Sequence, residues 1–490
     1  MKNVNFLAVM LLSFMSVSMG LLSCSEDTMQ EINRNKNNPP DMASKFIITD
    51  VINNTAFTIT GTDYAFYASV YVEYNVGIWG QMYNAEIRTA EPTSATTYNN
   101  SWGSSYNNLW NLKTILEKCS PGGEEEIQTT ILGMAQVLTA YNLAMLTDLM
   151  GDVPWTEALQ PGVIFTPALD KQSDLYEVIN GLIADAIKNF EDELALPDAK
   201  RPESIDDQDP LFGGDTESWL QFAYGLKARY AMRLSKIKPN YDAVIAAAEN
   251  SFTKKSEEAY FKCGSSGINN PFFVFFRQRD YFGASQSLHD KLEARNDPRD
   301  DKFFRPYPGG DEVIFAPNGA PRQIQKYYGT SAQSTALVGA PVYLMSYHEL
   351  EFLKAEAYAR KNDLVNAATH LKNALTTCFT NVGLKVDQAD EYYESDVEPK
   401  LANQTDALKE ILTQKYFGLF EGEAIETYND IRRLKAMGEG STISLANTKQ
   451  FPLRYSYGAD DVTTNVNVRN AYGNGDYVYT ENVWWAGGSR

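Results

Sequence analysis

The sequence predicts a mainly α-helical protein that carries a loop-rich section late in the chain. From about residue 43, apolar side chains recur at spacings of three and four residues, which is the period of an amphipathic helix. A hydrophobic fraction of 43%, with 12% aromatic residues, can build a sizeable core and excludes global disorder. The helical period is lost in two sections, about 251–342 and about 440–490.

The predicted helices follow one another along the chain. They cover residues 43–60, 63–83, 105–119, 123–150, 172–191, 216–236, 240–250, 344–361, 363–378, 404–421 and 423–437. In the fourth of them, residues 124–126 (Glu-Glu-Glu) would lie at the positive end of the helix dipole. An apolar stripe then runs from Ile127 to Leu149.

The two sections without a helical period differ from the helices in composition. In section 251–342, residues 272–276 (Phe-Phe-Val-Phe-Phe), clusters of Asn and Gly, and residues 306–310 (Pro-Tyr-Pro-Gly-Gly) predict loops with short strands. Section 440–490 is rich in Asn, Gly, Tyr and Val, and we expect an irregular C-terminal segment there.

The first residues have the features of a secretion signal. Lys2 supplies a positive start, and residues 6–22 are apolar and almost uncharged. Residues 21–24 (Leu-Leu-Ser-Cys) resemble a bacterial lipobox, in which the cysteine takes the lipid. A transmembrane helix and an ordinary signal peptide with a chance cysteine are the alternatives. We expect Cys24 to be lipidated and to become the mature N-terminus.

This interpretation divides the chain into three parts. They are a lipoprotein signal peptide over 1–23, a lipidated flexible tether over 24–43 and a helical domain over 44–490. Glu26 and Asp27, just after Cys24, resemble the surface-export signal of bacteroidete-type lipoproteins. We therefore expect a lipid anchor in the outer membrane, with the protein facing outward.

Charge and rare residues exclude several classes of function. The net charge of −20 argues against a nucleic-acid partner, because phosphates repel an acidic surface. Three histidines leave little material for a His-rich metal site, and the four cysteines form no CxxC pair. We expect no metal and no cofactor. A disulfide among Cys119, Cys263 and Cys378 stays open.

Common catalytic motifs are missing from the sequence. It contains no HExxH, no GxSxG and no phosphate-binding GxxxxGK. We therefore expect that the protein is not an enzyme. A pair of carboxylates for glycoside hydrolysis remains an alternative, because such a pair leaves no sequence motif among 63 acidic residues.

One predicted pair of helices has a more specific pattern. Ala355, Tyr358, Ala367, Leu371 and Ala374 match the small and aromatic positions of a tetratricopeptide helix hairpin. Small residues let two helices approach closely, and the larger ones fill the groove between them. An unrelated antiparallel helix pair is the alternative, since the early Trp and the closing Pro of the repeat are missing.

Several segments in order resemble the SusD/RagB family, and its SusD-like subfamily in particular. They are residues 148–154 (Asp-Leu-Met-Gly-Asp-Val-Pro), 166–172 (Thr-Pro-Ala-Leu-Asp-Lys-Gln), Trp219 with Arg229 and Arg233, Glu423 with Arg432 and Arg433, and residues 451–454 (Phe-Pro-Leu-Arg). Together with the lipobox, they span nearly the whole mature chain.

The resemblance implies a fold and a function. The fold would be a scaffold of tetratricopeptide-like hairpins with a loop-rich ligand-binding half. The function would be that of a surface lid that captures oligosaccharides and passes them to a SusC-like TonB-dependent transporter. A peptide-binding RagB-like lid is one alternative; a helical glycoside hydrolase and a purely structural surface lipoprotein are others.

Candidate ligand contacts are aromatic residues near amide and charged side chains. Flat aromatic faces meet the C–H face of a sugar ring, and amide, carboxylate or guanidinium groups bond its hydroxyls. On this ground we expect Trp79, Tyr83, Trp102 and Tyr281 to bind the ligand. Their alternative role is core packing, because Trp79 and Tyr83, and likewise Trp102 and Tyr106, are four residues apart and would share a helix face.

For several charged residues in the chain, both a ligand-binding and a structural role are consistent with the sequence. Asp148 and Asp152 could ligate a metal, and Asp206, Asp207 and Asp209 could ligate calcium, but a structural role or a solvated loop is favoured for both sets. The four arginines of the family segments could bind an acidic ligand, and a structural role in pairing with carboxylates is favoured.

Overall fold

The computed structural model describes residues 42–89, 97–264, 267–333 and 335–490. Cys24 and the predicted signal peptide lie outside the described residues, as does the predicted tether up to residue 41. The chain divides after Ala43, and the fold described here is that of Ser44–Arg490.

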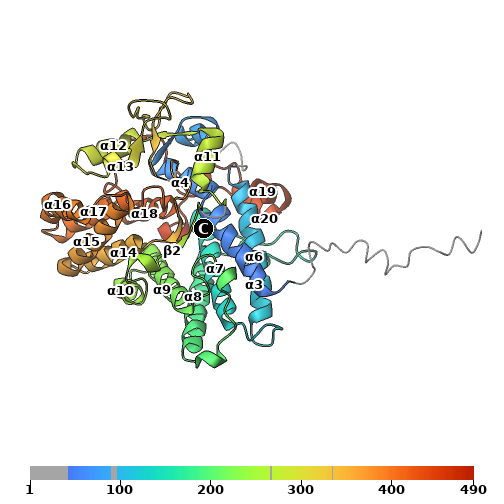
Figure 1. Cartoon of the computed structure of the whole chain (residues 1–490). Coiled ribbons are helices and arrows are strands. Elements are labelled where there is room, and N and C mark those ends of the chain that lie inside the picture. The colour runs from blue at the N-terminus through green and yellow to red at the C-terminus, as the bar shows by residue number, and fades with distance from the viewer. Residues whose placement is uncertain (1–41, 90–96, 265–266, 334) are drawn as a thin grey trace, which may run out of the picture. The chain divides into compact units, whose positions relative to one another are not determined.

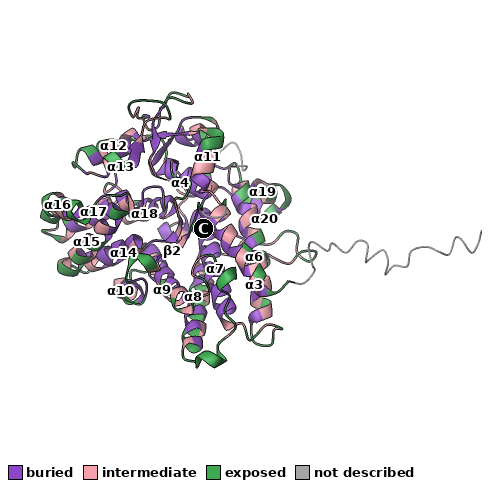
Figure 2. Cartoon of the chain, viewed as in Figure 1, coloured by how far each residue is buried: buried purple, intermediate pink, exposed green. Residues whose placement is uncertain are grey.

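A first group of helices packs largely in sequence order (Figure 1). It consists of α3 (Ser44–Asn54), α6 (Asn99–Cys119), α7 (Thr129–Met150), α8 (Gln172–Leu194), α9 (Thr216–Arg233) and α10 (Tyr241–Glu249). Helix α7 is central, since residues 130–150 are all buried (Figure 2). Gly133 lets α8 approach closely, because a β-carbon there would lie 2.4 Å from the ring of Phe190.

Helix α7 is also long and apolar enough to cross a membrane. Among the described residues it is the one such helix, and 89% of its apolar stretch is buried inside the fold. Burial by neighbouring helices explains this composition, because a core helix is apolar on all sides.

A second group of helices follows residue 346 and confirms the predicted tetratricopeptide-like hairpin. It consists of α14 (Tyr347–Arg360), α15 (Leu364–Asn381), α16 (Val386–Tyr392), α17 (Gln404–Gly418) and α18 (Ala424–Met437). Ser346 and Asp363 cap the hairpin helices through their side-chain oxygens. Tyr358 of α14 stacks on His370 of α15, with ring centroids 5.4 Å apart.

The predicted helix 63–83 is divided in the structure. Its residues form α4 (Asp63–Tyr71), the short strand β1 (Asn75–Gly77) and the start of α5 (Gly80–Glu86). The chain leaves the helical conformation at Glu73, whose φ is 64°. The prediction of one continuous helix was therefore wrong.

The start of the predicted helix 123–150 was also wrong. Helix α7 begins at Thr129, and residues 124–126 lie in a turn before it. Ile127, assigned to the apolar stripe, is 73% exposed.

The section 251–342 contains short strands and short helices. The strands pair antiparallel as β1 with β3 (Phe282–Ala284), β2 (Ala259–Phe261) with β6 (Val342–Met345), and β4 (Phe304–Arg305) with β5 (Thr330–Ser331). Its helices are α11 (Pro271–Arg279), α12 (Gln286–Glu293) and α13 (Asp300–Phe303). Residues 272–276 lie in α11 and form no strand, because Asn270 caps a helix that has Pro271 in its first turn.

The C-terminal section also contains helices, contrary to the expected irregular structure. They are α19 (Ala459–Thr464), α20 (Val466–Tyr472) and α21 (Tyr477–Thr480). Short 3-10 and π segments complete the described elements: η1 (Thr55–Thr60), η3 (Asp198–Lys200), η4 (Asp206–Gln208), η5 (Leu234–Lys236), η6 (Lys255–Glu257), η7 (Tyr393–Val397), η8 (Glu398–Lys400) and η9 (Trp484–Ala486).

The arginines of the family segments are buried and bonded inside the fold. Arg229 Nε donates to Glu349 Oε1 at 2.9 Å, and Arg433 Nη1 donates to Glu356 Oε1 at 2.8 Å. Each pair joins helices that are distant in sequence. Their role is structural, since a guanidinium so bonded in the core is not available to a ligand.

Candidate ligand-binding site

The pairing of β1 with β3 brings two of the candidate aromatic residues together. Gly77 is opposite Phe282, and the backbone N–H of Ile78 donates to the carbonyl of Tyr281 at 2.9 Å. Trp79 directly follows Ile78, so two segments about two hundred residues apart in sequence meet at this strand end. In Figure 1, α11, which leads into β3, lies beside the N-terminal segment that contains α4.

Tyr281 is held in place by its neighbours on this surface. Gly80 has a φ of 54°, and a β-carbon at that position would lie 2.7 Å from Cε2 of Tyr281. The ring therefore packs directly on the backbone of residue 80. Phe275 of α11 meets the same ring edge to face, with centroids 5.7 Å apart. These contacts orient the ring before any ligand arrives.

Trp79 and Tyr83 belong to the segment that contacts Tyr281 through Ile78 and Gly80. Trp79 is 37% exposed and occupies the N-cap position of α5, with an extended backbone. The N–H of Tyr83 donates to the carbonyl of Trp79 at 3.1 Å, which begins the helix, and Tyr83 is half-buried. The structure thus places three of the four candidate aromatic residues in one neighbourhood, which we call the aromatic surface (Trp79, Tyr83 and Tyr281).

Trp102 is not part of this surface. Its side chain is 1% exposed, and its indole N–H donates to the carboxylate of Asp461. The rings of Tyr106 and Tyr457 pack against it. Core packing, the alternative role, describes Trp102 in this structure, because a buried indole offers no face to a sugar.

A loop that the sequence analysis did not select also borders the aromatic surface. Gln325 Nε2 donates to the carbonyl of Arg279 at 2.7 Å, and the N–H of Lys326 donates to Asp280 Oδ2 at 2.8 Å. Tyr327, in the same loop, is 36% exposed. Only these tertiary contacts reveal the loop as a neighbour, since its composition is that of an ordinary surface loop.

Among the described residues, two of the larger openings lie elsewhere. A cavity of about 140 Å³ is lined by residues such as His348, Cys378 and Phe417. An open groove of about 500 Å³ lies between α6 and the loop before α8, with Trp110 and Asn107 among its residues. The aromatic surface is distinct from both openings, because it lies where the ends of β1 and β3 meet.

The described cysteines are free and buried, so the disulfide left open by the sequence does not form among Cys119, Cys263 and Cys378. Burial raises the pKa of Cys263 to about 11 and that of Cys378 to about 12. Neither thiol is therefore available as a thiolate nucleophile near neutral pH.

Three of the carboxylates considered as metal ligands (Asp148, Asp152 and Asp209) have structural partners, whereas Asp206 and Asp207 are exposed in a short 3-10 turn. Tyr176 donates its hydroxyl hydrogen to Asp148, and the N–H of Gln172 donates to Asp152 Oδ1 at 2.8 Å. Asp209 accepts the indole N–H of Trp219 at 2.7 Å and several backbone N–H groups of the following turn. These side chains stabilise turns and helix ends.

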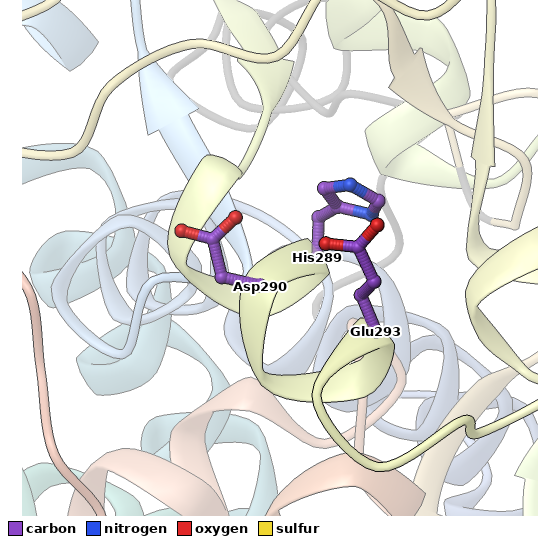
Figure 3. A group of neighbouring side chains, drawn as sticks. All are labelled: His289, Asp290 and Glu293. Atoms are coloured by element: carbon purple, nitrogen blue, oxygen red, sulfur yellow. The ribbon is translucent and has the colours of Figure 1, made fainter.

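One group of side chains on α12 could hold a cation (Figure 3). His289, Asp290 and Glu293 have ligand atoms within 4.8 Å of one another, and both carboxylates are exposed. The imidazole stacks on Phe315, with centroids 4.0 Å apart, and its Nδ1 lies 2.8 Å from Asp300 Oδ2. The ring is thus already held by protein contacts.

The helical scaffold and the tetratricopeptide-like hairpin define a mainly helical fold. A family described as SusD-like, starch-binding and associating with the outer membrane matches residues 36–458. A SusD/RagB family protein from Bacteroides thetaiotaomicron has 40% sequence identity and a TM-score of 0.81, with 92% of this chain and 100% of that chain covered. The chain therefore belongs to the SusD/RagB family.

More distant structures share the fold. A chitin-binding SusD homologue from Flavobacterium johnsoniae has 19% identity and a TM-score of 0.72, covering 90% of this chain and 98% of that chain. A SusD-like protein from Bacteroides thetaiotaomicron has 17% identity and a TM-score of 0.73, with the same coverage. No curated protein matches the chain.

Proposed function

We propose that this protein is a cell-surface glycan-binding lipoprotein. It captures oligosaccharides at the aromatic surface and delivers them to a SusC-like TonB-dependent transporter in the outer membrane. The observation that carries the proposal is the contact between Tyr281 and the residues on either side of Trp79, on a SusD-like scaffold. The description of the family as starch-binding and the chitin-binding relative support the choice of a glycan.

The chemistry of the aromatic surface fits a sugar. The apolar C–H face of a pyranose packs on an exposed aromatic ring, and Trp79 exposes 37% of its surface. Because Gly80 and Phe275 fix the ring of Tyr281, little side-chain entropy is lost on binding. We propose that the protein binds its ligand and catalyses no reaction.

The location follows from the N-terminus. We propose lipidation at Cys24, a flexible tether over 24–43 and an outward orientation on the outer membrane. A polar tether of this length would let a lid swing over a transporter.

Two experiments test the proposal. Binding of neutral and charged oligosaccharides and of oligopeptides to the mature protein, compared with Trp79→Ala and Tyr281→Ala, identifies the ligand class and the site. Preferential binding of peptides would contradict the glycan proposal, and cleavage of a bound glycan would contradict the binding-only role. Purification of the tagged protein from detergent extracts of its own cells should also recover a large β-barrel protein, and its repeated absence would contradict the transporter partnership.

A further inference from the structure

Five basic side chains lie on α11, on β4 and on the loop 322–328, which adjoin Tyr281 and β3, and we propose that they make the aromatic surface selective for anionic saccharides that carry uronic acid or sulfate groups. This cationic cluster consists of Arg277, Arg279, Arg305, Arg322 and Lys326. The proposal rests on the proposed glycan-binding function and adds the substrate class to it.

Contacts with the aromatic surface place the cluster. Arg277 and Arg279 are in the last turn of α11, and Asp280, which ends that helix, directly precedes Tyr281. The hydrogen bond from the N–H of Lys326 to Asp280 attaches the 322–328 loop to the same point. Arg322 lies over the ring of Tyr327, with its Cζ 5.3 Å from the centroid. The cations thus come from the end of α11 and the 322–328 loop, which meet beside Tyr281, and from β4, which carries Arg305.

The cluster is unusual because its charges are unpaired. The chain has 43 basic and 63 acidic residues, so carboxylates are in excess. Other arginines form ion pairs with these carboxylates: Arg295 pairs with Glu410, Arg360 with Glu439 and Arg490 with Glu481. Among the described residues, by contrast, no member of the cationic cluster forms an ion pair.

The position of Arg305 is electrostatically unfavourable for its charge. It is half-buried, and its Nε is buried without a hydrogen-bond partner among the described residues. Burial, with the neighbouring charge of Arg277 as a second cause, lowers the pKa of the Arg305 guanidinium. The exposed Arg277 and the half-buried Arg305 carry like charges that repel each other, and a bound anion would relieve that repulsion.

Neighbouring acidic side chains offset only part of the charge of the cluster. Asp280 is half-buried, accepts the backbone N–H of Lys326 with one oxygen and is attracted by the Lys326 charge, while burial raises the pKa of its carboxyl group. Asp311 and Glu312, in the neighbouring loop, form no ion pair with the cluster in the described structure. A positive local potential therefore remains on a protein whose net charge is −20.

The position of the cluster favours a saccharide over other anions. A lipid headgroup or an acidic peptide needs positive charge but no flat ring for a pyranose. Here the cations lie on segments that adjoin Tyr281, and a guanidinium can hold a carboxylate or a sulfate by two parallel hydrogen bonds. A sugar with an anionic substituent can use both kinds of contact at once.

The test compares oligosaccharides that differ in charge. Oligogalacturonate carries carboxylates, dextran sulfate carries sulfate esters, and maltoheptaose and chitohexaose are neutral. Calorimetry with the mature Cys24→Ala chain should give an affinity at least about tenfold higher for an anionic than for a neutral ligand, with the two anionic probes separating carboxylate from sulfate. Raising NaCl from about 50 to about 300 mM should weaken only the anionic ligands, because salt screens exposed charges.

Charge variants locate the effect. Arg277→Gln combined with Arg279→Gln should lower the anionic affinity by about tenfold and leave any neutral affinity within about twofold. The control, Lys188→Gln combined with Lys238→Gln, removes the same charge from exposed positions outside the cluster and should change neither affinity. Equal effects of the two double variants would overturn the proposal, because the charge would then act non-specifically.

The remaining outcomes separate this inference from the proposed function. Equal or tighter binding of neutral glycans, still lost in Trp79→Ala, overturns the anionic preference and keeps the glycan-binding function. Absence of binding to every glycan, charged or neutral, overturns both. Cluster-dependent binding to vesicles containing about 30% phosphatidylglycerol, with no saccharide bound, would show a membrane surface instead and would also overturn the inference.

Discussion

The aromatic ring of Tyr281 occupies the space in which a β-carbon of residue 80 would lie, with Cε2 2.7 Å from that position. Glycine is thus required at position 80 for two reasons. A β-carbon would collide with the ring, and the φ of 54° is strained for any residue with a side chain. The packing of the backbone of residue 80 against this ring fixes the orientation of Tyr281 at the surface.

Gly80→Ala should displace Tyr281 and weaken glycan binding. The added methyl group meets the ring, and the positive φ costs about 1–2 kcal/mol for alanine. We expect binding to fall by at least about tenfold while unfolding in urea shows a cooperative transition with a loss of about 1–2 kcal/mol. Gly103→Ala is the control: it lies in α6 with nothing within 4 Å of an added β-carbon, and it should keep full binding.

Trp79→Ala should act mainly on glycan binding, whereas Trp102→Ala should act mainly on the stability of the fold. Trp79 is 37% exposed, so its loss should weaken glycan binding and lower the free energy of unfolding by about 1–2 kcal/mol, less than the loss of the fully buried Trp102. Trp102 is 1% exposed and fills the core, so its loss should cost about 3–5 kcal/mol. Calorimetric binding and urea unfolding of both variants check this. A stable Trp102→Ala protein with impaired binding would show that the buried assignment is wrong.

Cys24→Ala should release the protein from the membrane. The thiol is the proposed attachment point of the lipid, and no acyl group can be added to alanine. Fractionation and palmitate labelling of cells that express each form check this. Retention of an unlabelled Cys24→Ala protein in the membrane fraction would contradict the anchor, and Cys263→Ala, which removes a buried thiol, is the matched control.

Sequence periodicity predicted the long helices well, because each must bury an apolar face. It failed where a distant contact decides the backbone. Glu73 has a positive φ, and its carboxylate accepts the N–H of Asn447 at 2.7 Å and the N–H of Ala446 at 2.9 Å. Those partners are more than 370 residues away, so no local pattern could reveal that the helix ends there.

The candidate site was predicted only in part for a similar reason. Aromatic and amide composition selected Trp79, Tyr83 and Tyr281, but it could not tell them from Trp102, because helical spacing does not say which face is covered. The meeting of Trp79 with Tyr281 depends on strands of three residues, which are too short to predict. The start of α11 did carry a signal, since Asn270 followed by Pro271 is a typical helix start.

His348 should make the protein less stable in acid. Burial lowers its pKa from 6.5 to about 4, with Glu349 and Lys255 as the charged groups that act on it, and Nε2 lies 3.5 Å from Glu423 Oε2. The unfolded chain binds a proton at His348 near pH 6.5, whereas the folded chain does so only near pH 4. The stabilisation is therefore complete above about pH 6.5 and is lost as the pH falls towards 4, by about 1.4 kcal/mol per pH unit.

The measurement is the free energy of unfolding in urea at several pH values between 7.5 and 4.5. His348→Gln lacks the titrating group, so its stability relative to the native protein should improve as the pH falls, even if it is less stable at neutral pH. His370→Gln is the control, because this ring is half-buried and bonded to Glu351. Parallel pH curves for the native protein and His348→Gln would mean that His348 titrates alike in both states, and that burial does not keep its ring neutral.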